Sequence, residues 1–248
     1  MDQDLEDLIN TIVLDNYESL HKDICEVTQN DPLLHSVLSG VALGDRRTHS
    51  SFKRARVSAQ NGEEMVSLAL SQEILIKENP KSNSYLAETP LSSKLSFALP
   101  FVRFWFAFIS PLYKGILEEN YDEVHQKFSN HRQEFMHLLY EDLTKELLKL
   151  YFKEDPLKEI GSYWNHVIDI EIFATTISGK KIVGIVRSSK QKMKKSELAK
   201  LQKLCLDASL EIDTFVLFSK NGFSNELKAL KGENLKLFTL KNFKALVA

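Results

Sequence analysis

Hydrophobic residues recur every three to four positions along most of the N-terminal half of the chain, a spacing typical of helices. Residues 5–29 predict one or two amphipathic helices. A further helix is expected to start at Asp31-Pro32 and to end at the glycines near Gly44. Residues 61–72 form another helical run. This half of the chain is therefore expected to be mainly helical.

Two short β-rich runs follow these helices. Residues 73–80 and 94–99 predict strands, and residues 81–93 between them form a polar loop. Three short helices followed by two strands are the element order of a winged helix-turn-helix, although many small three-helix units share that order.

The hydrophobic period changes at Pro156. Residues 104–153 are expected to be helical, whereas the residues after Pro156 alternate between apolar and polar. The predicted elements are strands at 158–164, 167–176 and 181–189, a helix at 194–208, a strand at 212–219, a helix at 225–230 and a strand at 235–240. Residues 134–218 should thus fold as a helix, a three-stranded antiparallel unit, a helix and a strand that returns through a crossover, which is an α/β (α+β) arrangement.

Composition and charge refine this picture. The chain has 248 residues, 43% of them hydrophobic, and can bury one large core or two small ones. Its formal net charge is only -2, yet residues 178–248 hold 15 Lys and Arg against 6 acidic residues. Such a basic third can attract a polyanion or an acidic partner, or can be an ordinary solvated surface.

Two further features concern the compartment. Cys25 and Cys205 match no metal-ligand spacing and predict reduced thiols in a cytoplasmic protein. The most apolar stretch, from Leu95 to Tyr113, is close to membrane-spanning length, but Arg103 near its centre and two prolines favour a buried aromatic segment. We therefore expect no membrane contact.

Several stretches together resemble one family, the domain of unknown function found C-terminal to archaeal-type P-loop ATPases. The stretches are residues 99–111, the helix around 140–141, residues 160–164, the acidic strand at 167–176 and residues 217–227. The resemblance covers residues 35–248. It implies a helical and winged-helix-like region, here residues 1–103, followed by a PD-(D/E)XK restriction-endonuclease-like α/β domain, here residues 104–248.

The ATPase module that usually precedes this domain is not expected in the chain. A phosphate-binding Walker A loop needs closely spaced glycines and Gly-Lys-Ser/Thr, and no such sequence occurs. ATP hydrolysis is therefore not predicted.

The resemblance also implies where a nuclease site would lie. Glu171 falls at the family's metal-binding aspartate, Asp169 two residues earlier, and Glu141 at the supporting helix position. On the next strand Ile185 and Arg187 stand where the family tends to show a glutamate and a lysine. Isoleucine cannot bind magnesium, and arginine cannot serve as a base, so the catalytic site is predicted to be a remnant.

Alternatives stay open for these residues. Glu141, Asp169 and Glu171 could form a shifted site for Mg or Mn, with Asp169 and Glu171 as metal ligands, if the chain is an active nuclease. Otherwise the acids lie on a solvent-facing strand edge beside lysines, and no cofactor is expected. Arg187 is interpreted either as a phosphate contact or as part of a salt bridge. The histidines, including His137, are interpreted as surface or packing residues.

A basic segment lies where a helix-turn-helix contacts the DNA backbone. Its candidate phosphate-binding residues are Arg46, Arg47, Lys53, Arg54 and Arg56. The candidate recognition helix, however, carries Glu63 and Glu64 near its start, and these would repel phosphate. A second basic zone, residues 188–203, would flank the old active-site cleft.

The sequence therefore predicts a non-catalytic, nuclease-like protein that acts as a nucleic-acid-binding or protein-interaction module. Two alternatives are an active metal-dependent endonuclease with a rearranged acidic site and a docking partner of a separate ATPase. The expected partners are nucleic acid, such an ATPase, or further copies of the chain.

Overall fold

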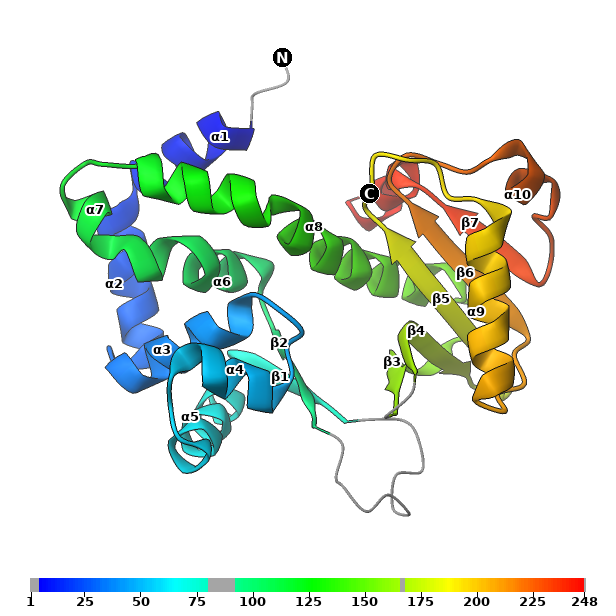
Figure 1. The fold of residues 1–248 in the computed structure, drawn as a ribbon, viewed down its shortest axis with the longest axis horizontal. Helices are drawn as coiled ribbons and strands as arrows, with labels where there is room; N and C mark the ends of the chain where they lie inside the picture. Colours follow the sequence, from blue (N-terminus) through cyan, green and yellow to red (C-terminus); the bar gives the residue numbers. More distant parts are fainter. Residues whose placement is uncertain (1–4, 80–91, 166–167, 248) are drawn as a thin grey trace. The chain divides into compact units, whose positions relative to one another are not determined.

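The chain divides into two compact units (Figure 1). Among the described residues, the first comprises 5–79 and 92–134, and the second comprises 135–165 and 168–247. A computed structural model describes residues 5–79, 92–165 and 168–247. Most of the expected loop at 81–93 therefore lies outside the described residues, as do His166 and Val167.

The first unit is mainly helical, as predicted. Its third helix begins where Asp31 caps it, since the carboxylate accepts hydrogen bonds from the N–H groups of Leu33 (2.7 Å) and Leu34 (3.0 Å). Pro32 at the first helical position needs no N–H partner. The elements are α1 (Leu5–Leu8), η1 (Ile9–Leu14), α2 (Tyr17–Thr28), α3 (Pro32–Ala42), α4 (Thr48–Ala55), α5 (Ala59–Ser71), β1 (Leu75–Glu78), β2 (Lys94–Phe97), α6 (Pro100–Phe104), η3 (Trp105–Ile109), η4 (Ser110–Leu112), α7 (Tyr113–Leu117) and the first part of α8 (Asp122–Tyr151).

Helices α3, α4 and α5 precede the hairpin of β1 and β2, so the element order matches the expectation. The two strands pair antiparallel, with Leu75 opposite Phe97. Helix α3 supplies the core through a buried stripe at helical spacing: Leu34, Val37, Leu38 and Val41. Helix α4 lies within the basic segment, where the hydrophobic pattern had not singled out a helix.

The aromatic segment forms the centre of the same unit. All five residues of η3 are buried, so the predicted buried aromatic segment is confirmed over Trp105–Ile109, whereas Leu99, Phe101 and Tyr113 of the same stretch are exposed. Phe106 stacks on Phe97 and meets His35 edge-on. Arg103 of α6 is buried and donates from Nε to the carbonyl oxygen of Ala42 (3.0 Å). Within the described residues, no helix has the length and apolar character needed to cross a membrane.

The second unit contains a five-stranded sheet with the order β3-β4-β5-β6-β7. Strands β3, β4 and β5 pair antiparallel, whereas β5, β6 and β7 pair parallel. The predicted helix, three antiparallel strands, helix and returning strand are therefore confirmed. After α8, the elements are β3 (Leu157–Trp164), β4 (Asp169–Thr176), β5 (Lys181–Arg187), α9 (Lys195–Asp207), β6 (Thr214–Ser219), α10 (Asn225–Ala229), β7 (Leu235–Phe238) and η5 (Leu240–Leu246).

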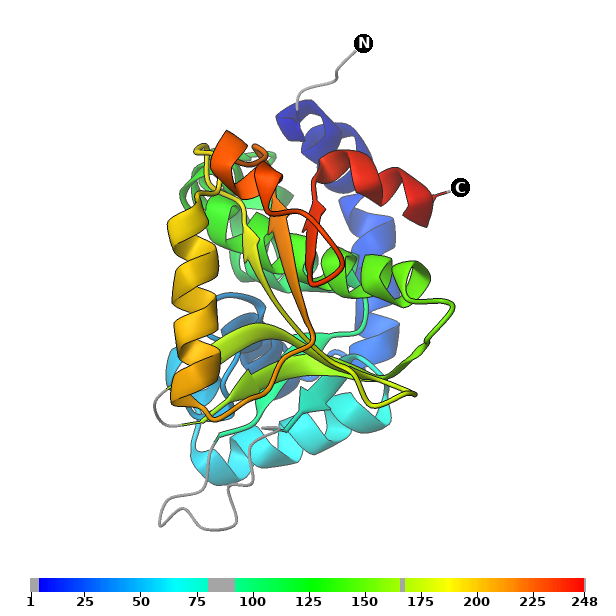
Figure 2. The ribbon, with the colours of Figure 1, turned by 90° about the vertical axis from the view of Figure 1, so that its right-hand side faces the viewer.

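Helices cover both faces of this sheet (Figure 2). On one face, Leu198, Leu201 and Cys205 of α9 pack with strand residues that include Val183 and Ile185. On the other face, α8 and η5 pack against a second set of strand residues, which includes Ile172, Ala174, Ile182, Val186, Val216 and Phe218. The central strand β5 is buried at five consecutive positions, 182–186, because both of its faces are covered.

The division between the units falls within α8, between Glu134 and Phe135, rather than at residue 103. The reason is the packing of the aromatic segment, because Phe106 and Arg103 contact residues of α3 and β2. Residues 104–134 thus belong with the helical unit, and α8 runs from one unit into the other.

Candidate functional site

The candidate site lies where β4 and β5 stop pairing. Their ladder runs from Thr175 opposite Lys181 to Ile172 opposite Gly184. Strand β5 continues beyond this point along β6, as far as Arg187. There the Glu171 carboxylate accepts a hydrogen bond from the Val186 N–H at 2.6 Å. The glutamate therefore bonds a backbone donor of β5 just past the last paired residue of β4.

A register shift in β4 explains the direction of the Glu171 side chain. Gly161 pairs with Phe173 and Tyr163 pairs with Ile170, so two steps along β3 correspond to three along β4. Such a bulge breaks the alternation of side chains. Ile170 accordingly packs on the α9 face, Ile172 packs on the α8 face, and Glu171 reaches a histidine of α8.

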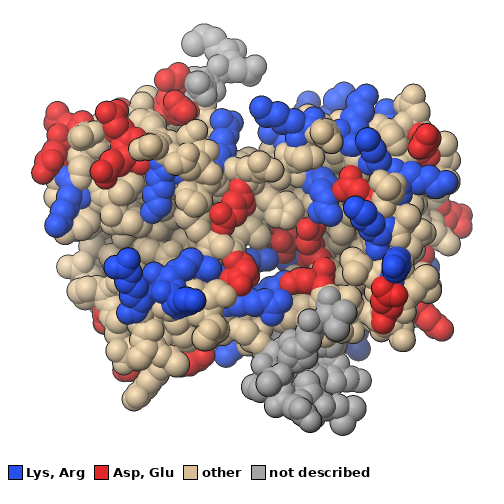
Figure 3. Space-filling view, in the orientation of Figure 1, with Lys and Arg blue, Asp and Glu red and all other residues tan. Residues whose placement is uncertain are grey.

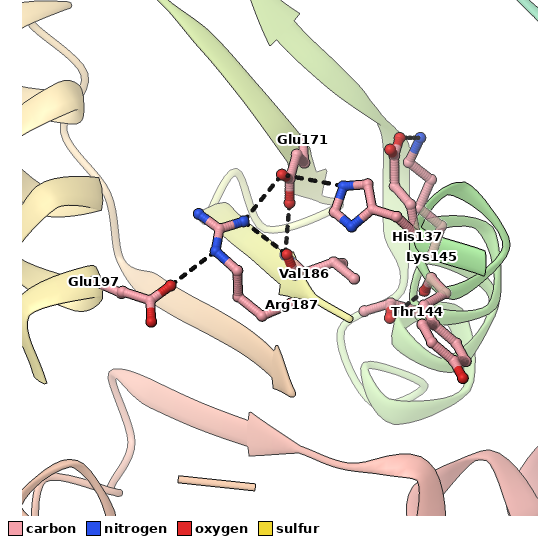
Figure 4. Close-up of polar contacts among 9 residues, drawn as sticks. His137, Thr144, Lys145, Glu171, Val186, Arg187 and Glu197 are labelled. Atoms are coloured by element: carbon pink, nitrogen blue, oxygen red, sulfur yellow. Dashed lines mark hydrogen bonds and ion pairs between the residues drawn. The ribbon is translucent and has the colours of Figure 1, made fainter. Parts of the chain in front are cut away.

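Arg187 connects two carboxylates at the end of β5 (Figure 4). Its NH1 group lies 3.2 Å from Glu171 Oε1, and its Nε donates to Glu197 Oε2 of α9 at 2.8 Å. NH1 also donates to the carbonyl oxygen of Val186 at 2.7 Å. Of the two interpretations of Arg187, the structure contains the salt bridge. Its guanidinium group holds β4, β5 and α9 together.

His137 of α8 approaches Glu171 from the opposite side, with Nε2 at 3.5 Å from Oε1 (Figure 4). The hydrogen bond with Glu171 raises the pKa of His137, and the charges of Glu171 and Glu141 raise it further, while burial and Arg187 oppose the shift. The protonated imidazole is therefore favoured. Arg187 thus contacts both Glu171 and Glu197, and His137 contacts Glu171 from the other side.

The other two acids of the predicted site lie in different surroundings. Glu141, one helical turn after His137, is 3% exposed and its Oε1 accepts from Lys145 Nζ at 2.8 Å. Asp169 is the first residue of β4 and is exposed. Among the described residues, no group of three or more His, Cys, Asp and Glu side chains lies close enough to hold a metal ion.

These residues do not fit a magnesium or manganese ion. Both metals require several oxygen ligands, and the oxygens of Glu171 already accept from Val186 and contact Arg187 and His137. Ile185, at the position of the second ligand, is 7% exposed and packs in the apolar cluster under α9. Its side chain offers a metal no oxygen.

The five predicted phosphate-binding residues do not share one environment. Arg46 is buried, with a backbone φ of 60°, and donates from NH1 to Ser96 Oγ at 3.0 Å. Arg47 is half-buried. Arg54 donates from Nε to the carbonyl oxygen of Gly40 (2.9 Å). Lys53 and Arg56 are exposed. The expectation of five surface cations therefore does not hold for Arg46.

Two residues of the network, His137 and Glu197, were not predicted as members of the site. His137 precedes Glu141 by four residues, a spacing that places both on one face of a helix. Because Glu141 was already a candidate, this spacing could have identified His137 from the sequence. Glu197 lies in the first turn of α9, and only the packing of α9 brings it to Arg187.

Comparison with known proteins gives one similarity. Residues 105–199 match the model of DUF234, a family described as archaeal and bacterial proteins of unknown function. The matched residues run from the aromatic segment through α8, β3, β4 and β5 into the first turn of α9, and so include Glu171 and Arg187. No curated protein and no solved structure matches the chain. Over residues 105–199, the chain is thus similar to a family of unknown function found in archaea and bacteria.

Proposed function

We propose that this chain is a non-catalytic, nuclease-like protein that binds nucleic acid through the second unit. The helix, three antiparallel strands, helix and parallel strand follow the order of the PD-(D/E)XK fold. The observation that carries the loss of catalysis is the engagement of Glu171 by Val186, Arg187 and His137. In a metal-dependent nuclease, a metal ion and water lie beside the corresponding carboxylate, whereas the guanidinium group of Arg187 and the imidazole of His137 lie there in this chain.

Exposed lysines near the carboxyl ends of β5 and β6 support the binding surface. In this lysine surface, the connection from β5 to α9 carries Lys190, Lys192 and Lys194, α9 begins with Lys195, and the connection after β6 carries Lys220. In Figure 3, basic side chains gather over α9 and the adjoining connections. The carboxyl end of parallel strands is the usual place for ligands in open α/β sheets.

Hydrogen bonds between the two connections hold the lysine surface in place. Met193 N–H donates to the Gly222 carbonyl oxygen, and Ser224 N–H donates to the Met193 carbonyl oxygen, both at 2.9 Å. Asn221 Nδ2 donates to the carbonyl oxygen of Ser189 at 2.6 Å. A surface fixed in this way binds phosphates with less loss of conformational entropy than a free loop.

The first unit is proposed to contribute less. Helices α3, α4 and α5 and the β1–β2 hairpin have the order of a winged helix, yet Arg46 is buried and Arg54 is bonded within the unit. Lys53 and Arg56 are exposed and, unlike the exposed Arg54, form no side-chain hydrogen bond or ion pair within the described residues. A secondary, sequence-independent contact to phosphates is the role that these two support.

The test is a titration of labelled duplex and single-stranded oligonucleotides by fluorescence anisotropy at several salt concentrations. Replacing Lys190, Lys192 and Lys194 by alanine should weaken binding and lower the slope of log K against log salt by about 0.9 for each phosphate that the variant no longer neutralises. The matched control replaces Lys153, Lys158 and Lys180, which are equally exposed but lie near the amino end of β5. Equal weakening by both triple variants would show that only net charge matters.

Cleavage is measured in the same samples with magnesium and with manganese. We expect none above background. Metal-dependent cleavage that Glu171→Ala abolishes would instead establish the active-nuclease alternative. If the wild type binds no nucleic acid at low salt, the protein-interaction alternative, including docking on an ATPase, replaces this proposal.

A further inference from the structure

A cavity in the first unit is lined by cationic and hydroxyl side chains. Its volume is about 370 Å³, within the range of about 300–1,000 Å³ that is typical of small-molecule sites. Elements α3, α4, η4 and α8 form its walls. Its polar lining consists of His35, Ser36, Ser39, Arg54, Ser110 and Lys127. None of the described residues that line the cavity is acidic.

Lys127 is the cation of this cavity that lacks a counter-charge. It is half-buried, and within the described parts of the chain its ammonium group forms no hydrogen bond or ion pair. Removal from water lowers the pKa of Lys127. An ammonium group that loses water without gaining an acceptor is unfavourable, and an anion in the cavity would supply that acceptor.

Arg54 is held in a fixed position at the cavity wall. Its Nε donates to the carbonyl oxygen of Gly40 at 2.9 Å, and NH2 donates to Ser51 Oγ at 3.2 Å and to Asp45 Oδ1 at 3.4 Å. These bonds orient the guanidinium group before any ligand arrives, which reduces the entropy lost on binding. They also compensate part of its charge, so Lys127 supplies most of the attraction for an anion.

The remaining polar groups are suited to hydrogen bonding rather than to charge. Thr28 Oγ1 donates to the Ile24 carbonyl oxygen at 2.8 Å, so His35 Nε2, 2.6 Å away, must carry the proton and donate to Thr28. Burial and nearby His21 lower the pKa of His35, which favours the neutral ring. The hydroxyl groups of Ser39 and Ser110 form no hydrogen bonds within the described residues and are free to donate.

A second cavity of the same unit has the opposite charge. It measures about 570 Å³, and its lining includes Asp15, Glu18 and Glu119 but no Lys, Arg or His among the described residues. The absence of carboxylates from the smaller cavity is therefore a local property and does not follow from the composition of the unit.

We propose that the smaller cavity binds a small phosphate-bearing ligand. Lys127 and Arg54 contact the phosphate oxygens, and Ser39 and Ser110 donate hydrogen bonds to them. Arginine and lysine are the side chains that most often bind phosphate, and hydroxyl donors complete its coordination. This site is independent of the lysine surface of the second unit, so failure of the nucleic-acid-binding proposal would leave the phosphate-binding proposal unaffected, and the reverse also holds.

The experiment measures the affinity of the full chain for inorganic phosphate, adenosine monophosphate and adenosine, by calorimetry and by thermal unfolding. Phosphate and the monophosphate should bind and raise Tm, whereas uncharged adenosine should not. Tighter binding of the monophosphate assigns the site to a phosphomonoester, and equal binding assigns it to free phosphate. A wild type that responds to neither anion overturns the proposal.

Lys127→Met removes the uncompensated charge and should raise Kd for phosphate at least about tenfold. Its Tm without ligand should be unchanged or higher, because a half-buried ammonium group is replaced by an apolar chain. Lys22→Met, at an exposed position of α2, is the control for the loss of one positive charge and should bind as the wild type does. If Lys127→Met does not fold, Ser39→Ala with Ser110→Ala should weaken phosphate binding severalfold. Wild-type affinity in the variant that folds contradicts the proposal.

Discussion

Replacing Glu171 distinguishes a structural carboxylate from a metal ligand, because the two roles predict stability changes of opposite sign. Carboxylates gathered for a metal repel one another in its absence, so removing one stabilises the metal-free protein. In the observed arrangement Glu171 instead accepts the Val186 N–H and contacts the Arg187 guanidinium group and the His137 ring. Its removal is therefore expected to destabilise the second unit.

The expected magnitude follows from the individual contacts. Leaving the Val186 N–H without an acceptor costs about 1–3 kcal/mol. Arg187 keeps Glu197 at 2.8 Å, so the loss of this half-exposed ion pair adds only about 0.5–1 kcal/mol. Glu171→Ala should thus lower the free energy of unfolding by about 1.5–4 kcal/mol. Glu171→Gln retains an oxygen that can accept from Val186, so it loses mainly the ion pair and should lower that free energy by about 0.5–1 kcal/mol.

The assay must report on the second unit alone, since two units can unfold in separate steps. Trp105 lies in the first unit and Trp164 in the second, and the sequence has 2 tryptophans. In a Trp105→Phe background, Trp164 fluorescence during urea unfolding follows the sheet. Glu211→Gln, at an exposed position before β6, is the control and should change stability by less than about 0.5 kcal/mol. An increase in stability for either Glu171 variant would refute the structural role.

Three further predictions concern the same sheet. Because the pKa of His137 is raised, the stability contributed by its protonated ring is fully present below pH 6.5, the unperturbed value, and is lost as the pH rises through the raised pKa. His137→Gln should remove this dependence from curves of Tm against pH. Ile185→Glu, with or without Arg187→Lys, should lower the free energy of unfolding by about 3 kcal/mol or more, because a carboxylate would enter the apolar cluster under α9. Calorimetry should detect no magnesium bound to either variant. Gly184→Ala should cost about 1–3 kcal/mol by urea unfolding, since the added Cβ would lie 2.7 Å from the Val216 carbonyl oxygen.

The order of elements in the second unit could be predicted because its signals are local. Alternation after Pro156, the turn at Gly179 and the lysine-rich helical run each depend on neighbouring residues, and the observed strands fall within or close to the predicted ranges. The boundary between the units could not be predicted in the same way. It depends on the packing of Phe106 and Arg103 against α3 and β2, which are distant in sequence.

The candidate site was predictable only in part, for a comparable reason. The family resemblance pointed to Glu171 and Arg187, and both take part in the observed network. The contact with His137 depends on a bulge in β4, and such a bulge cannot be predicted from any single residue type. Arg46 illustrates the same limit, because its left-handed backbone conformation turns a cation of a basic segment into the unit, where it bonds Ser96.

The charge balance at the end of β5 also indicates which cations can meet a phosphate. Glu171 and Glu197 both engage Arg187, so a phosphate that approached this guanidinium group would have to displace a carboxylate from a half-buried site. Within the described residues, the exposed lysines of the adjoining connections form no ion pair with a carboxylate. The backbone of these connections is held by the hydrogen bonds of Met193 and Asn221. Nucleic-acid binding by this unit should therefore depend on lysines outside the former catalytic position, while Arg187 stabilises the sheet.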